Sequence, residues 1–217
     1  MVVDLRKELQ AHLPYSIFST AIGLVLASVL TFVGQGYTDA EFLSGARGLF
    51  HTFHPTHLLL SATATAAMFF RYEQRLIKAT LTGIVGAVVF CGIGDILIPA
   101  VGGYLLGGKL VLHICVLEHP GVVLPFVLLG SLAGCWAATT IERSTVYSHS
   151  SHVLLSTMGS IFYLIAFSMG RTWLEPEMVG RVFIVVTIAV MGPCCVSDIV
   201  FPLLVVRDEH GETHHEH

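Results

Sequence analysis

Long apolar blocks dominate this sequence and restrict what it can fold into. Six blocks can be placed, each close to the length of about 20 residues that a helix needs to cross a bilayer. Their ranges are 14–34, 50–70, 79–99, 121–141, 149–169 and 181–206. Of the 217 residues, 54% are hydrophobic and 12% are charged, against about 25% charged in an ordinary soluble domain. The sequence therefore predicts an all-α integral membrane protein with six transmembrane helices.

The remaining composition narrows the class of protein further. A net charge of −4 and a pI near 6.3 give no basic surface for nucleic acid. The first apolar block is too long for the core of a cleavable signal peptide, so a retained helix is expected. Neither an H-E-x-x-H motif nor a P-loop occurs, so no hydrolase or ATPase motif supports an enzyme. The predicted partners are the lipid bilayer and small ions, with no nucleic acid.

The positive charges in the linkers predict an orientation. Seven Lys and Arg residues fall on one predicted side: Arg6, Lys7, Arg71, Arg75, Lys78, Arg143 and Arg207. Four fall on the other: Arg47, Lys109, Arg171 and Arg181. Because cytoplasmic loops carry the excess of positive charge, both termini are expected in the cytoplasm. A bacterial inner membrane is the expected compartment.

Two phrases in the apolar blocks occur twice. HPTHLLLS at 54–61 returns as HSSHVLLS at 149–156, with five of eight positions identical. CGIGDILIP at 91–99 returns as CCVSDIVFP at 194–202, again with Cys, Asp, Ile and Pro matched. Ionisable residues are rare inside membrane spans, so chance does not readily match His-x-x-His and Asp in the same order.

The repetition predicts an internal duplication of three helices. Residues 1–110 form the first three-helix repeat, 111–206 the second, and 207–217 a His-rich cytoplasmic tail. Because three is odd, the second copy must enter the membrane inverted. Two inverted repeats (3+3) about an in-plane axis are a recurrent plan in secondary transporters.

Each repeat offers two imidazoles and one carboxylate. The histidines of a pair are three residues apart and so share one helix face, and Ser61 and Ser156 extend these faces. The predicted metal ligands are His54, His57, Asp95, His149, His152 and Asp198. Imidazole and carboxylate suit Zn²⁺, Fe²⁺, Mn²⁺ or Co²⁺. Because the imidazoles must be neutral to bind, metal competes with protons.

Further residues could complete such a site. Cys91 and Cys194 each precede a predicted aspartate ligand by four residues, whereas the others lie at the start of the second block or in the third linker. These additional candidate ligands are His51, Cys91, His113, Glu118, His119 and Cys194. With the second helix starting near residue 50, His57 lies about 10 Å below the surface. That depth favours one site at each end, and a single midplane site would require broken helices.

The sequence predicts a secondary transporter of a divalent transition-metal cation, coupled to protons and perhaps assembled as a homodimer. Three bland or rival explanations remain open. The His and Asp side chains could only clamp helices together. Cys91 and Cys194 could form a thiol-redox relay instead. The histidines could serve a haem- or quinone-binding membrane subunit.

Overall fold

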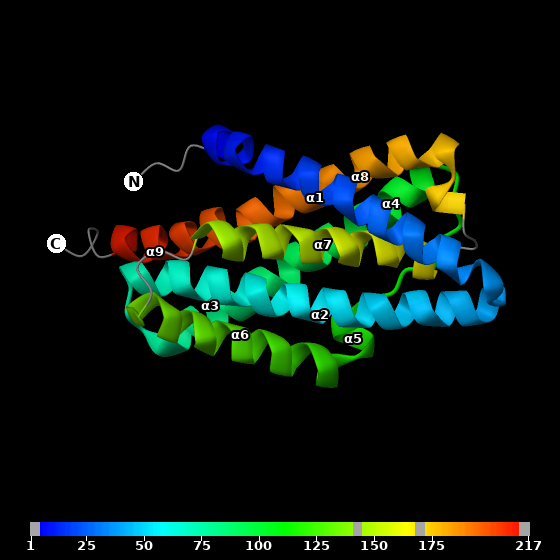
Figure 1. Ribbon diagram of the computed structural model, residues 1–217. Coiled ribbons are helices and arrows are strands. Elements are labelled where there is room, and N and C mark those ends of the chain that lie inside the picture. Colours follow the sequence, from blue (N-terminus) through cyan, green and yellow to red (C-terminus); the bar gives the residue numbers. More distant parts are fainter. Residues whose placement is uncertain (1–4, 141–144, 168–171, 213–217) are drawn as a thin grey trace.

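The computed structural model describes residues 5–140, 145–167 and 172–212, and the regular elements in these ranges are all helical (Figure 1). The α-helices are α1 (Leu5–Val33), α2 (Asp39–Tyr72), α3 (Leu76–Gly86), α4 (Ile98–Leu105), α5 (Cys115–Glu118), α6 (Pro120–Thr140), α7 (Thr145–Phe167), α8 (Pro176–Cys195) and α9 (Phe201–Glu212). The 3₁₀ helices are η1 (Gly34–Gly36) and η4 (Thr172–Leu174), and the π-helical segments are η2 (Ala87–Cys91), η3 (Ile93–Leu97) and η5 (Val196–Val200).

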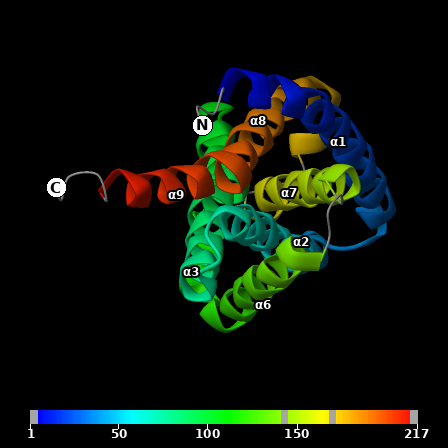
Figure 2. The ribbon, with the colours of Figure 1, turned by 90° about the vertical axis from the view of Figure 1, so that its left-hand side faces the viewer.

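The long helices run along one bundle, with the start of α1 and the end of α9 at the same end (Figure 1). Helix α2 packs against α3, α6 and α7, while α1 packs against α7 and α8. Seen along the bundle, α7 lies among α1, α2 and α8 (Figure 2). Helices α2 and α7 are therefore the pair whose side chains meet inside the protein.

Four helical stretches are long and apolar enough to cross a membrane: His12–Gly36, Leu76–Leu105, Pro120–Thr139 and Pro176–Val206. Their outward faces are apolar. Exposed residues on them include Phe18, Phe32, Ile77, Leu105, Leu129, Trp136 and Ile184. Water would penalise so much exposed apolar surface, whereas lipid does not. The prediction of a helical membrane protein is thus confirmed at this level.

The other two predicted spans are more polar. Helix α2 contains the block 50–70, and Ser151–Phe167 is the apolar part of α7, one residue short of the 18 required of a span. The polar residues of these helices are buried, among them His57, Ser61, Thr65, His152 and Ser156. Since α2 and α7 face each other in the interior, they do not need a uniformly apolar surface. The six-helix, 3+3 arrangement stays a prediction.

The start of α2 corrects the sequence analysis. The predicted linker before residue 50 is mostly helix, because α2 begins at Asp39. Thr38 caps it: the Thr38 hydroxyl accepts a hydrogen bond from the Glu41 backbone N–H, and the Thr38 N–H donates to the Glu41 carboxylate. This T-x-x-E capping box is a known start signal that the apolar pattern obscured. Pro55 consequently lies inside α2 and not in its first turn.

Helix α6 comes unusually close to α2. A Cβ at Gly130 or Gly134 would overlap the backbone at Leu59 or Thr63 of α2, respectively. The Thr63 hydroxyl donates a hydrogen bond of 3.0 Å to the Gly130 carbonyl across this contact. Small residues four apart allow such backbone contact between membrane helices. The contact fixes α2 and the side chains that it carries.

Both conserved-looking Asp phrases of the sequence fall in π-helical turns. Asp95 lies in η3 and Asp198 in η5. The helical stretches that contain them, Leu76–Leu105 and Pro176–Val206, are continuous. The broken helices that a midplane site seemed to require are therefore replaced by local π turns, which often occur at functional sites.

Candidate metal centre

The buried ionisable residues of four elements meet in one place. We define the central cluster as His54 and His57 of α2, Asp95 of η3, His152 of α7, Cys194 of α8 and Asp198 of η5. All six side chains are buried, and those of His57 and Asp95 are fully so. In a bundle of this kind, such a concentration of buried polar groups requires mutual partners or a bound ion.

Asp95 organises the α2 side of the central cluster. One carboxylate oxygen, Oδ2, accepts hydrogen bonds from His57 Nδ1 at 2.7 Å and His54 Nδ1 at 2.8 Å. The other, Oδ1, accepts from the Ser156 hydroxyl at 2.8 Å. Gly159 makes room for the carboxylate, because a Cβ there would lie 3.0 Å from Asp95 Oδ2. With their Nδ1–H groups donated to Asp95, His54 and His57 have Nε2 as the nitrogen that can bind a metal.

His57 meets His152 across the bundle. Their Nε2 atoms lie 3.1 Å apart, with the rings nearly perpendicular at 81°. Cys194 Sγ is 3.7 Å from His57 Nε2 and donates to the Ser156 hydroxyl at 3.6 Å. Asp198 Oδ2 is 3.5 Å from His152 Nε2. Four potential ligand atoms from four elements thus surround a small volume.

The spacing of these atoms resembles a metal coordination shell. Bonds of about 2.0–2.1 Å to nitrogen or oxygen and about 2.3 Å to sulfur place neighbouring tetrahedral ligand atoms roughly 3.3–3.6 Å apart. The observed separations of 3.1, 3.5 and 3.7 Å are close to this range. The Asp95 carboxylate behind His57 is also the partner that metal-bound imidazoles usually have. The cluster could therefore hold a divalent cation with little rearrangement.

Asp198 is held by the first half of the chain. The Ser61 hydroxyl lies 3.0 Å from both Asp198 Oδ1 and Ser197 Oγ. Thr65 donates to the Ser197 carbonyl at 3.0 Å. Ser197 and Thr65 were missed in the sequence analysis, although Thr65 continues the helix face of His57 and Ser61 at four-residue spacing.

The predicted ligands are brought together more closely than the sequence suggested. Two separate end sites were favoured because α2 was expected to start near residue 50, and that expectation is wrong. With α2 starting at Asp39, His57 lies near the middle of a 34-residue helix and reaches His152. Of the predicted ligands, the His149 side chain lies outside the described residues. Cys91 is buried and free but makes no described bond to the cluster.

A second group of side chains lies around α5. We define the α5 cluster as His51, His113, Cys115, Glu118 and His119. His113 Nδ1 is 2.8 Å from Glu118 Oε2, and Cys115 Sγ is 3.6 Å from His51 Nδ1. Burial lowers the pKa of His113 despite the opposing effect of Glu118. Burial and Glu118 together raise the pKa of the Cys115 thiol to about 11.

Comparison with family models, curated proteins and solved structures finds no match to this chain. The function has to be inferred from the geometry alone.

Proposed function

We propose that this chain is a secondary transporter of a divalent transition-metal cation, with the central cluster as its binding site. The observation that carries the proposal is the meeting of His57 and His152 at 3.1 Å, beside Cys194 and Asp198. Two imidazoles, a thiol and a carboxylate suit borderline ions such as Zn²⁺, Fe²⁺, Mn²⁺ or Co²⁺. Their burial among candidate membrane spans supports passage of the ion through the bilayer.

The same contact supports coupling to protons. Two ring nitrogens 3.1 Å apart repel each other unless one of them carries a proton. A cation that binds both nitrogens has to displace that proton, and a thiol ligand loses its own. Loading the site with metal would therefore release protons, and reprotonation would favour release of the metal.

Several contacts support the proposed 3+3 inverted repeats. Ser156 of the second half donates to Asp95 of the first, and Ser61 of the first donates to Asp198 of the second. A pseudo-two-fold axis would produce this exchange of equivalent partners. The π-helical segments at 93–97 and 196–200 also occupy matching positions. On this proposal the site lies where the two repeats meet, and both termini face the cytoplasm.

A proton pathway is the second candidate function. Asp95, His57, His152 and Asp198 form a continuous chain, with contacts of 2.7, 3.1 and 3.5 Å. Such a chain of ionisable groups can relay protons without any metal. The two candidates differ in whether a divalent cation is bound and moved.

The other two alternatives gain less from the geometry. A porphyrin has no room between ring nitrogens that are 3.1 Å apart, so His57 and His152 cannot be its two axial ligands in this arrangement. The thiol relay stays a prediction, with Cys91 and Cys194 both buried and free. It requires that Cys91→Ser and Cys194→Ser each remove all activity while histidine variants keep theirs.

Flux into proteoliposomes tests the proposal. The full-length protein is reconstituted with a metal-sensitive dye and a pH-sensitive dye inside, and Zn²⁺, Mn²⁺, Fe²⁺ or Co²⁺ is added outside. We expect metal uptake with opposite proton movement, and its loss in the variants His57→Ala, Asp95→Ala, His152→Ala and Asp198→Ala. Glu177→Gln is the matched control, since Glu177 is exposed at the start of α8.

Two results separate the candidates. Proton flux without metal flux, lost in the same variants, would replace the transporter proposal by the proton pathway. Wild-type metal flux in all four variants would show that the central cluster is not the binding site.

A further inference from the structure

The α5 cluster contains three imidazole rings that face one another outside the central cluster. One ligand nitrogen from each of His51, His113 and His119 lies within 4.8 Å of the other two. The ring centroids are 4.8, 5.1 and 5.5 Å apart. Three imidazoles bound to one tetrahedral ion at about 2.0–2.1 Å would have centroids roughly 5 Å apart. The rings are thus spaced as three ligands of one ion would be.

His113 is oriented as a metal-bound imidazole usually is. Its Nδ1 is held by the Glu118 carboxylate at 2.8 Å. Its Nε2 is buried and has no hydrogen-bond partner among the described residues, and the whole side chain is 6% exposed. A buried nitrogen without a partner is costly, whereas a carboxylate behind an imidazole is the arrangement that orients metal-bound histidines.

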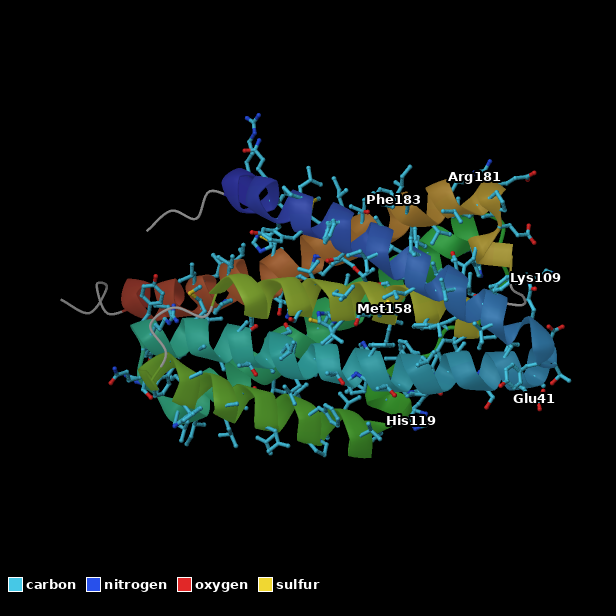
Figure 3. All side chains as sticks on the ribbon, viewed as in Figure 1. Glu41, Lys109, His119, Met158, Arg181 and Phe183 are labelled. Atoms are coloured by element: carbon cyan, nitrogen blue, oxygen red, sulfur yellow. The ribbon has the colours of Figure 1, made fainter. Side chains whose placement is uncertain are left out.

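Aromatic packing fixes this orientation. The His113 ring stacks on Phe167, with centroids 4.4 Å apart and planes 9° from parallel. The Tyr163 hydroxyl accepts a hydrogen bond from the His113 backbone N–H. The neighbouring His119 is exposed near the start of α6 (Figure 3), so an ion can reach the cluster from solvent.

We propose that His51, His113 and His119 form a second metal site, which takes a divalent borderline cation such as Zn²⁺ or Co²⁺. Glu118 positions His113 and does not need to touch the ion. The site stands on its own residues, and it exists whether or not the central cluster transports metal.

The position of the site suggests that it loads the central cluster, and this part of the inference rests on the proposed function. His51, His54 and His57 follow one another at three-residue spacing along α2, so they form a ladder on one side of the helix. His54 lines a cavity of about 320 Å³ that is otherwise apolar. Ile114 and Val116, from the segment that carries His113, line the same cavity. An ion leaving the α5 cluster would meet His54 before it meets His57.

Cobalt titration tests the second site. Full-length protein in detergent is titrated with Co²⁺ alone, and the visible absorption of bound cobalt is recorded. We expect two ions per chain beyond any that the tail binds, and one fewer in His119→Ala. Because the His119 side chain is exposed, this variant should fold normally. His217→Ala in the tail is the matched control for loss of an imidazole.

A second pair of variants tests the role of Glu118. Glu118→Gln should weaken the α5 site roughly 10–100-fold, the usual effect of losing such a partner. Glu177→Gln, which removes an exposed carboxylate elsewhere, should leave it unchanged. If His119→Ala and Glu118→Gln both bind Co²⁺ as the wild type does, the α5 site is overturned. If His57→Ala alone leaves the cobalt count unchanged, the central site fails and the α5 site stands.

Discussion

The ligand side chains of the central cluster are held by hydroxyl groups as much as by each other. Ser156 and Ser61 each donate to a buried aspartate of the opposite half. A carboxylate that loses such a donor keeps the cost of its burial but not the compensation. The two serines are therefore as important to the site as its ligands.

Replacing one serine tests this at the residue scale. Ser156→Ala should destabilise the protein by about 1.5–3 kcal/mol, the usual contribution of a hydrogen bond to a charged group. Ser61→Ala should have a similar effect, because its partner Asp198 is the equivalent carboxylate. Thermal unfolding in detergent measures both. Thr52→Ser is the control, since the Thr52 hydroxyl is exposed and bonds only within α2.

If neither alanine variant unfolds at a lower temperature than the control, these hydrogen bonds do not hold the aspartates. A large effect of Ser156→Ala with none of Ser61→Ala would contradict the equivalence of the two halves.

At the residue scale, the sequence predicted most of the site. Matched His-x-x-His and Asp phrases identified His57, His152, Asp95 and Asp198 before any geometry was known. The exchange of serine partners between the halves was not predictable, because a one-dimensional pattern does not say which helices face each other. Ser197 was missed for the same reason, since its partner Thr65 lies in the other half.

Elements place these residues through close backbone contact. Gly130 and Gly134 of α6 touch the backbone of α2, and an added methyl group at either would push the two helices apart. Overpacking of this kind costs about 1–3 kcal/mol. We expect Gly130→Ala and Gly134→Ala each to lower the unfolding temperature and to weaken metal binding by shifting α2.

Gly121→Ala is the control for these variants. It lies in the same helix, and a Cβ there meets nothing within 4 Å. Equal stability of all three alanine variants would mean that α6 does not position α2.

The start of α2 makes a prediction about pH. The Thr38 hydroxyl and backbone N–H hold the pKa of Glu41 below its ordinary value of 4.5. A lowered folded-state pKa means that this capping interaction stabilises α2 above the pKa of the unfolded chain. The stabilisation is lost as the pH falls through the folded pKa. In Thr38→Ala the pKa of Glu41 should rise towards 4.5, as measured by NMR titration of its carboxyl carbon.

An unchanged Glu41 pKa in Thr38→Ala would contradict the capping box. Asp39→Asn is the control, because Asp39 lies in the same turn but is not part of the box.

Element boundaries were the least predictable part of the fold. Apolar blocks located the spans, but α2 extends eleven residues before the block that starts at 50. Residues 39–49 are too polar for a hydropathy pattern to include, and helix formation there depends on the Thr38 cap. The π turns at Asp95 and Asp198 were also not predictable, since helix pattern does not distinguish a π turn from an α turn over five residues.

The whole molecule combines a lipid-compatible exterior with a polar interior shared by α2 and α7. Hydropathy explains the exterior, and it also explains why four stretches qualify as membrane spans by composition. The interior pair carries the chemistry and is more polar for that reason. The proposed inverted repeat joins the two observations, since it brings the equivalent histidines of α2 and α7 to one place.

The central claim is that this place binds a metal through His57, His152 and Cys194. X-ray absorption at the zinc edge tests it most directly, on zinc-loaded and desalted His119→Ala protein, in which the α5 site is disabled. The account predicts one retained zinc per chain, with imidazole nitrogen at about 2.0–2.1 Å and sulfur at about 2.3 Å. Absence of retained zinc, or a zinc with neither imidazole nor sulfur in its shell, would contradict the account.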